Sequence, residues 1–210
     1  MVDSSHEQTG HRSSEAAVLA AAERVFVERG YNGARMQEIA DAAGINKAML
    51  HYYFRSKEKL FRTVFGGILN RTLPPLVEAL GSELPLGLKI RRFIESYIDA
   101  LERTPTLPAF ILGELNRDAS YFDEVIREAA APIIPVLERQ IQEAASAGRI
   151  KFVAAHDLLT TLLSLCIFPF VARPFLSAVF GMDDDSYRKF LDSRKATVTS
   201  FVFSSLQPES

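Results

Sequence analysis

One short stretch of the sequence, residues 47–57, combines side chains that can contact nucleic acid. Lysine can pair with phosphate, and histidine and tyrosine can donate hydrogen bonds to phosphate oxygens. A small alanine and an apolar methionine can approach base edges such as the thymine methyl group. The residues of these types are Lys47, Ala48, Met49, His51, Tyr52 and Lys57. Their types and close spacing predict a DNA-binding surface.

Basic side chains are concentrated around this stretch, although the chain as a whole is slightly acidic. The net charge is −2 and the isoelectric point is near 6.1, so overall charge gives no reason to expect a polyanionic partner. Positions 35–62 nevertheless contain six basic and three acidic residues. This local excess favours a DNA-binding site. A packed helical pair whose lysines form a solvated face is an alternative of similar weight on these residues alone.

The elements that must position this surface follow helical spacing. A first helix, capped by Ser13 or Ser14, is predicted to stop at Gly30, and a second to run over about 36–43. Gly44 supplies the positive φ of a sharp turn between the second and third helices. Ile45 then points inward. This pattern predicts a helix-turn-helix.

The third helix, predicted over 47–53, is capped by Asn46 and is too short to persist in water alone. Leu50 and Phe54 are spaced i to i+4, so they should hold it against the first two helices. Ser56 caps a fourth, longer helix that continues as a connector to about residue 81. Pro74 and Pro75 are predicted to kink this helix or to end it early.

The four blocks GYNG, EIA-x-x-AGI, KAMLHYYF and SKEKLF occur in an order and spacing that resemble the N-terminal domain of the TetR family of transcriptional regulators, over residues 12–62. Helical spacing along the chain predicts an all-α fold, and the polar, small-residue composition of residues 1–11 predicts a disordered arm. The resemblance implies a three-helix DNA-binding head. It implies a helical body, here 84–206, that dimerises and binds a small effector. By this resemblance Lys47, Ala48, Met49, His51 and Tyr52 lie on the recognition helix, and Lys57 touches backbone phosphate.

Two positions depart from the family pattern. Ala34 and Arg35 stand where the family usually has a serine or threonine that caps the second helix and touches phosphate. Arg35 can still reach a phosphate but cannot cap. His51 stands where the family often has tyrosine, and its imidazole can also donate to phosphate. We therefore expect Arg35 and Asn46 to join the DNA-binding set.

The rest of the chain reads as helices with broad apolar faces. The first predicted helix, 87–104, ends before Pro105 and carries Ile90, Phe93, Ile94, Tyr97, Ile98 and Leu101 on one face. The others are 107–118; 122–150, bent by Pro132 and Pro135; an apolar segment over 154–180; and 185–206. Two apolar helical segments at the end of a chain favour a four-helix interface with a second copy, whose two-fold symmetry suits a palindromic operator. Its predicted residues are Leu162, Phe175, Tyr187, Phe190, Leu191, Arg194, Val198, Phe201 and Val202.

A ligand pocket is a second use for the apolar faces. Its candidate residues are Phe93, Tyr97, Phe110, Glu114, Asn116, Phe122, Phe168, Phe170 and Arg173. Any one of these aromatics can equally be part of the core. Few polar groups are available to specify a polar ligand, so we expect an apolar or aromatic effector. Glu114 and Arg173 lie in apolar surroundings and need a partner, a ligand or solvent.

Enzyme, metal and cofactor sites are not expected. The four histidines are scattered, and metalloprotease, phosphate-loop and nucleophile-elbow motifs do not occur. Asp183–Asp185 suit a helix start. Cys166, the one cysteine, fits a packing role in a reducing cytoplasm. The apolar run 158–172 is shorter than the roughly 18 residues of a membrane span and contains Pro169, and no secretory signal opens the chain, so we expect a soluble cytoplasmic protein.

These features predict a homodimeric, ligand-responsive regulator that binds double-stranded DNA, with repression as the expected sign. The alternative is a helical ligand-binding or protein-interaction module whose head has lost specific DNA binding.

Overall fold

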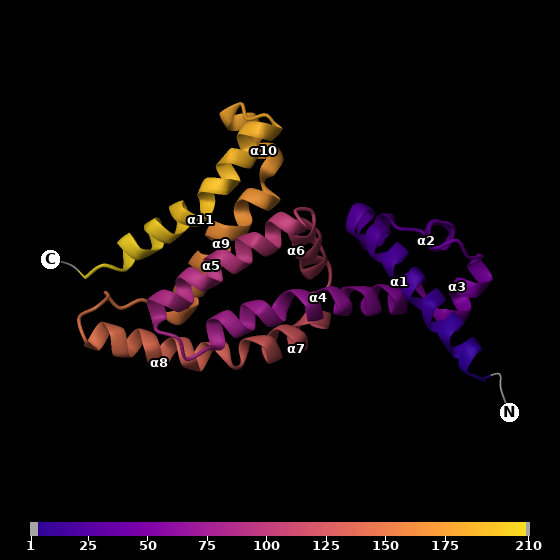
Figure 1. Ribbon diagram of the computed structural model, residues 1–210, viewed down its shortest axis with the longest axis horizontal. Coiled ribbons are helices and arrows are strands. Elements are labelled where there is room, and N and C mark those ends of the chain that lie inside the picture. Colours follow the sequence, from indigo (N-terminus) through magenta and orange to yellow (C-terminus); the bar gives the residue numbers. More distant parts are fainter. Residues whose placement is uncertain (1–3, 209–210) are drawn as a thin grey trace. The chain divides into compact units, whose positions relative to one another are not determined.

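The computed structural model describes residues 4–208, without the side chains of residues 4–13, 119–122 and 124. Every regular element in this range is a helix, which confirms the all-α prediction (Figure 1). The helices are α1 (Ser4–Gly33), α2 (Met36–Ala42), α3 (Lys47–Tyr53), α4 (Lys57–Gly81), α5 (Leu86–Arg103), α6 (Leu107–Arg117), α7 (Ala119–Ala130), α8 (Ile133–Ser146), α9 (Ala155–Val171), α10 (Arg173–Phe180) and α11 (Asp184–Leu206).

The chain divides into two compact units. The head comprises Met1–Arg71 together with Leu112–Arg117, and the body comprises Thr72–Ile111 together with Asp118–Ser210. Helix α6 therefore contributes its last residues to the head, which is not continuous in sequence.

The head is built around two glycine turns that the sequence predicted. Helix α1 is interrupted at Gly30, where φ is 65°, and Gly44 has a φ of 68° between α2 and α3. Both values lie in the left-handed region that glycine tolerates best. Phe26, Phe61 and Phe65 are fully buried, and the rings of Phe26 and Phe61 meet edge to face at 5.1 Å. This aromatic core holds α1 against α4.

The start of the chain differs from its prediction. Residues 1–11 were expected to form a disordered arm, but α1 is helical from Ser4 onward. This segment contains no proline, and Glu7, Gln8 and Arg12 are good helix formers. Local propensity is thus compatible with a helix that begins before the predicted serine cap.

The body is held by a core in which α5, α9 and α11 lie side by side (Figure 1). All six predicted apolar residues of α5 are buried, and they pack with residues such as Leu137, Leu162 and Val202. Cys166 is a free, fully buried thiol in this core. Burial raises the pKa of the Cys166 thiol to about 12, which fits the packing role predicted for it.

Some prolines of the body separate two helices, and others lie within one. The predicted bent helix over 122–150 is two helices, α7 and α8, which separate at Ala131 and Pro132. Proline cannot donate a backbone hydrogen bond, so Pro132 and Pro135 fit the start of a new helix better than the interior of one. Helix α4, by contrast, continues through Pro74 and Pro75 to Gly81.

The apolar segment over 154–180 also forms two helices. Helices α9 and α10 meet at a bend of 74°, and no single helix within residues 4–208 is long and apolar enough to cross a membrane. The bent pair together meets the length and composition of a broken span. Pro169 lies inside α9 and is buried.

Candidate nucleic-acid interface

Helix α3 is fixed at both ends by local hydrogen bonds. The Asn46 side-chain oxygen accepts the backbone N–H of Met49 at 2.8 Å, as the capping prediction requires. At the other end, the Phe54 N–H donates to the carbonyl of Leu50 at 2.8 Å. The Ser56 hydroxyl then accepts the Lys59 N–H at 3.1 Å and opens α4. The cap satisfies a donor that a short helix would otherwise leave exposed.

The two faces of α3 have opposite character. Leu50 is fully buried and Phe54 is 3% exposed, so both point inward as predicted. Lys47, Ala48 and His51 are exposed on the other face. Met49 is 43% exposed and Tyr52 is 75% exposed. The helix therefore presents a cation, an imidazole, a phenol and two small or apolar groups to solvent, as a major-groove reader does.

The start of α2 adds one exposed cation. Ala34 is 2% exposed, and Arg35 occupies the N-cap position without a side-chain capping bond. The absence of a capping bond confirms that Arg35 does not cap α2. Its side chain is exposed, and its contact with phosphate stays a prediction. One turn along, Glu38 pairs with Arg29 of α1 at 2.9 Å. This bridge ties α2 to α1 beside the exposed Arg35.

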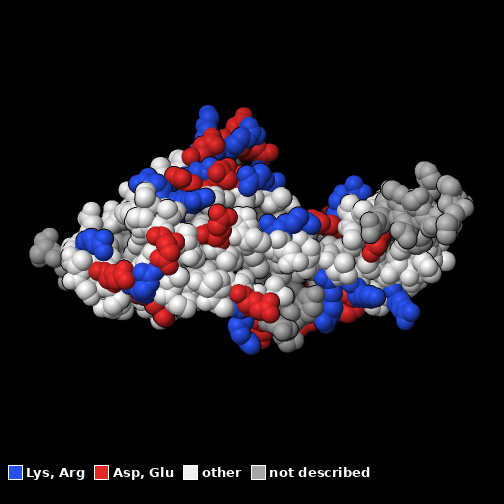
Figure 2. Space-filling view, turned by 60° about the horizontal axis from the view of Figure 1, so that its bottom comes forward, with Lys and Arg blue, Asp and Glu red and all other residues white. Residues whose placement is uncertain are grey.

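Only some of the charged side chains near α3 form ion pairs. Among the residues that the structure describes, Arg35, Lys47, Arg55 and Lys59 have no ion-pair partner, whereas Arg62 pairs with Glu58 at 2.6 Å. On the face of the molecule in Figure 2, basic and acidic side chains are intermixed. The unpaired cations next to α3 are thus the groups there that are free to meet an anionic partner.

Lys57 is engaged within the head. Its amine lies 4.6 Å from the ring centroid of Tyr31 and donates to the carbonyl of Asn32 at 3.5 Å. Partial burial, followed by the nearby Arg117 guanidinium, lowers the pKa of Lys57. The predicted phosphate contact of Lys57 would therefore start from an amine that is already held against Tyr31.

Glu114 lies in the head and not in the body. It is 5% exposed, and its carboxylate accepts the backbone N–H of Tyr31 at 2.8 Å and the side chain of Arg117 at 2.5 Å. The Arg117 guanidinium also lies 4.2 Å from the Tyr31 ring centroid. These contacts supply the partner that a buried acid needs, so Glu114 is placed away from the body pocket in which it was predicted.

The other predicted pocket residues are scattered. Phe93, Tyr97, Phe110 and Phe170 are buried, while Phe168 is 52% exposed. Asn116 is exposed in the head, where it donates to the Leu112 carbonyl at 2.9 Å. Arg173 is exposed and pairs with Asp184 at 2.9 Å, and the side chain of Phe122 lies outside the described residues. Of the predicted pocket residues, only Phe93, Tyr97 and Phe170 share the core of the body.

The predicted dimer residues divide into two groups. Leu162, Tyr187, Val198 and Val202 are buried within a single protomer, and Arg194 donates to the carbonyl of Leu165 at 3.0 Å. Phe190 and Leu191 are half-buried. Phe175 and Phe201 are each 62% exposed. Direct apolar contact with a second copy would rest mainly on these exposed members.

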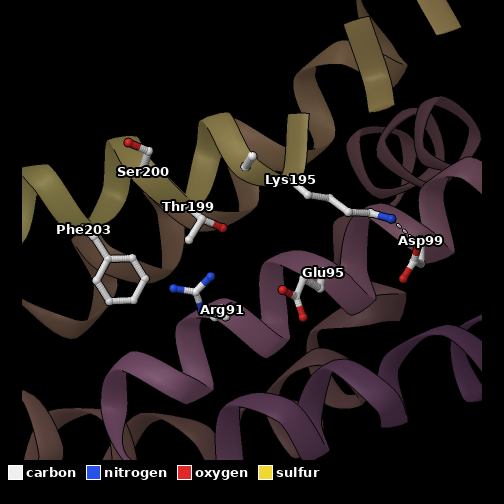
Figure 3. Close-up of a pocket in the computed structure, with 8 residues that line it drawn as sticks. Arg91, Glu95, Asp99, Lys195, Thr199, Ser200 and Phe203 are labelled. Atoms are coloured by element: carbon white, nitrogen blue, oxygen red, sulfur yellow. Dashed lines mark hydrogen bonds and ion pairs between the residues drawn. The ribbon is translucent and has the colours of Figure 1, made fainter. Parts of the chain in front are cut away.

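The described part of the body has hollows on its surface, of which two are the best formed. A groove of about 650 Å³ runs between α5 and α11, with Arg91, Glu95 and Asp99 facing Lys195 and Phe203 (Figure 3). Lys195 bonds to Asp99, which closes one end. The second hollow, of about 320 Å³, is mostly apolar and is lined by Pro85, Leu86, Gly87, Ile90, Ala144, Arg149, Ile150, Phe203, Leu206 and Gln207.

Lys89 was missed by sequence reasoning. It is fully buried on α5, next to the predicted apolar face. The signal was available: Lys89 lies three residues after Leu86 and four before Phe93, which is the spacing of one helical face.

Comparisons with known proteins cover both units. Residues 18–64 match the family model described as bacterial regulatory proteins, tetR family, and residues 88–202 match the model of a tetracyclin repressor-like C-terminal domain. The transcriptional activator FasR of Mycolicibacterium smegmatis is 35% identical over 85 residues. The match covers 40% of this chain and 39% of FasR, so the chain spans under two-fifths of the length of that relative. The transcriptional repressor DhaR of Mycobacterium sp. strain GP1 is 26% identical over 187 residues, 88% of each chain.

A solved structure agrees with this pattern. HlyIIR, a hemolysin II transcriptional regulator, superposes with a TM-score of 0.61 and 25% identity, covering 94% of this chain and 99% of HlyIIR. The helical head followed by a helical body is therefore a shared architecture.

Proposed function

The chain belongs to the TetR family of bacterial regulatory proteins, and from this premise we propose that it is a transcriptional regulator that binds DNA as a homodimer and responds to a small effector. The family consists of regulators and not of enzymes. The proposed place of action is the cytoplasm, where bacterial DNA lies. We propose that the protein represses transcription, in line with the repressor DhaR, which the chain matches over 88% of its length.

The observation that carries this proposal is the outward face of α3. Lys47, His51 and Tyr52 are exposed on a helix whose opposite face is locked by Leu50. A capped, rigid helix can enter the major groove without first paying the entropy of ordering its backbone. Arg35 and Lys47 would position the helix on phosphates, and Ala48 with Met49 would approach base edges.

A second copy is the proposed partner of the exposed aromatics on the body. Phe175 and Phe201 place large apolar area in solvent, which a homodimer would cover. Two heads related by a two-fold axis would then contact two half-sites of a palindromic operator. The proposed effector is an apolar or aromatic molecule, because the buried part of the body is dominated by aliphatic and aromatic side chains.

The test is DNA binding by the purified protein as salt is raised. DNA from around its own coding region is compared with unrelated DNA at each salt concentration. A specific regulator should prefer one fragment and lose affinity steeply with salt, because phosphate contacts release counterions. Weak and equal binding to all fragments would favour the alternative, a helical ligand-binding or interaction module without specific DNA binding.

Two substitutions test the assigned face. Lys47→Ala should weaken binding to all sequences and reduce the salt slope by about 1, since one phosphate contact is lost. Tyr52→Ala should also abolish tight binding, with helix content and dimer unchanged. Lys189→Ala, at an exposed lysine of α11, is the matched control for loss of one positive charge. If both head variants bind like the parent, the assignment of this face is wrong.

A further inference from the structure

Tyr31, next to the glycine that interrupts α1, is held by residues from a distant part of the chain. Its backbone N–H donates to the Glu114 carboxylate at 2.8 Å, across 83 residues of sequence. The centroid of its ring lies 4.2 Å from the Arg117 guanidinium and 4.6 Å from the Lys57 amine. All four residues belong to the head. One aromatic ring of the head is thus in contact with two cations.

Two cations beside the same ring repel each other unless an acid offsets one of them. Glu114 is this acid, because it is 5% exposed and binds Arg117 at 2.5 Å. The charges act on one another: burial and then Arg117 lower the pKa of Lys57, whereas Glu114 raises it. Without the charge of Glu114, an unpaired guanidinium would be left near the Lys57 amine.

Lys57 keeps donors available for a further partner. Among the described residues it forms no ion pair with an acid, unlike Arg117. A lysine amine has three N–H donors, and the bond that Lys57 makes to the Asn32 carbonyl is long, at 3.5 Å. Lys57 is also the first residue of α4, three residues after Phe54 at the end of α3. The ring of Tyr31 therefore holds a cation close in sequence to the predicted recognition helix.

We propose that Glu114 and Arg117 are positioning residues for DNA binding, because they fix the ring that holds the Lys57 amine ready for a backbone phosphate. A lysine side chain is long and flexible, so a phosphate contact normally costs the entropy of ordering it. In the head this ordering precedes DNA binding. The inference rests on the proposed DNA binding and adds to it two residues of α6, outside the helix-turn-helix.

The experiment measures the affinity of the full-length protein for duplex DNA at several salt concentrations. DNA from around the coding region and an unrelated duplex are each tested with the parent, Lys57→Ala, Glu114→Gln and the double variant. Loss of one phosphate contact should weaken binding about eightfold at about 0.1 M salt and reduce the salt slope by about 1. Glu114→Gln should show most of this loss. The double variant should bind like Lys57→Ala, because both substitutions act on one contact.

The direction of the Glu114→Gln effect separates positioning from net charge. Removing an acid makes the protein more positive, which by itself should strengthen DNA binding. Glu28→Gln, at an exposed acid of the head, is the matched control and should bind DNA at least as tightly as the parent. Adding Arg117→Met to Glu114→Gln removes the unpaired guanidinium and should recover part of the lost affinity.

A second readout needs no DNA. The Tyr31 ring should shift the NMR signals of the Lys57 methylene next to the amine upfield of those of Lys59, which is exposed. This difference should shrink in Glu114→Gln and persist in Glu28→Gln. If Glu114→Gln does not fold, Glu114→Asp replaces it. That variant keeps the charge but draws the carboxylate back from the Tyr31 N–H, and both effects should have the same direction.

Two results would overturn the inference. One is a Glu114 variant that matches the Glu28→Gln control in DNA affinity and in its Lys57 signals. The other is a double variant whose loss is the product of the two single losses, since Glu114 and Lys57 would then act separately. A parent that binds no DNA would contradict the proposed function. A parent that binds DNA beside an unaffected Glu114 variant would contradict this inference alone.

Discussion

The exposed face of α3 in the head and the exposed aromatics of α9–α11 in the body differ in what they offer to a partner. On α3 the exposed groups include Lys47, His51 and Tyr52, whose polar atoms are well solvated in the free protein. On the body they include Phe168, Phe175 and Phe201, which are poorly solvated alone. The exposed face of α3 suits a transient interaction, and the exposed aromatics of the body suit a permanent one.

The cores of the head and the body also differ, in whether their buried charged residue has a partner. The core of the head is aromatic, and its buried acid Glu114 is fully bonded. The core of the body is larger but contains a buried lysine without a partner among the described residues. A buried polar group that is satisfied stabilises the fold around it, whereas one that is unsatisfied lowers the stability of the folded state.

The largest expected effect comes from removing the support of α3. Leu50→Ala should destabilise the head by about 2–5 kcal/mol, because Leu50 is fully buried on a helix too short to persist alone. We expect DNA binding to be lost while the body and the dimer remain. Hydrogen exchange of the α3 amides and light scattering measure these two outcomes. Binding of parental strength would show that the head does not depend on this contact.

The next effect tests whether the body aromatics join two copies. Phe201→Asp should convert the dimer to monomers or aggregates, because a carboxylate would be buried without a partner. Phe152→Asp is the matched control, since Phe152 is 65% exposed but lies between α8 and α9. Light scattering after size-exclusion chromatography gives the oligomeric state. A stable dimer of the Phe201 variant would place the interface elsewhere.

A smaller effect separates capping from direct DNA contact. Asn46→Ala removes the bond to the Met49 N–H and should destabilise α3 by about 1 kcal/mol. DNA affinity should fall severalfold because the helix ends fray. Ser56→Ala removes the equivalent cap of α4 and is the matched control. Equal losses in the two variants would argue that the effect is general to the head.

The smallest expected effect concerns Cys166. Its pKa of about 12 keeps the buried thiol protonated, so alkylation by iodoacetamide near pH 8 should be negligible until denaturant opens the body. Because the folded pKa lies above that of the unfolded thiol, the group's stabilising contribution is complete below about pH 8.5 and declines as pH rises. Cys166→Ala should remove that decline in urea titrations. Rapid labelling of the native protein would contradict the burial.

Local patterns predicted the head well. The glycine turns, the Asn46 cap and the inward placement of Leu50 depend on neighbours within a few residues, and each was confirmed. Helical spacing in the body also predicted which face of α5 is buried. Spacing does not say what covers a buried face. Leu162 and Val198 were assigned to a second copy, but they are buried within one protomer.

Two further features were not predicted, because the usual preference of the residue pointed the other way. Pro132 separates α7 from α8, whereas Pro74 and Pro75 lie within α4, because surrounding packing decides whether a missing hydrogen bond ends a helix. Lys89 is buried although lysines on helices are usually exposed. In both cases the tertiary environment overrides the preference of the residue.

The contribution of Leu112–Arg117 to the head has a consequence for synthesis on the ribosome. At about 5–20 residues per second, roughly 2–9 s separate the appearance of Arg71 from that of Glu114. During this interval the Tyr31 N–H and ring lack the carboxylate and guanidinium that later bind them. The nascent head is therefore completed by a segment that is translated after part of the body. A fragment ending at Arg71 would lack the hydrogen bond from the Tyr31 N–H to the Glu114 carboxylate.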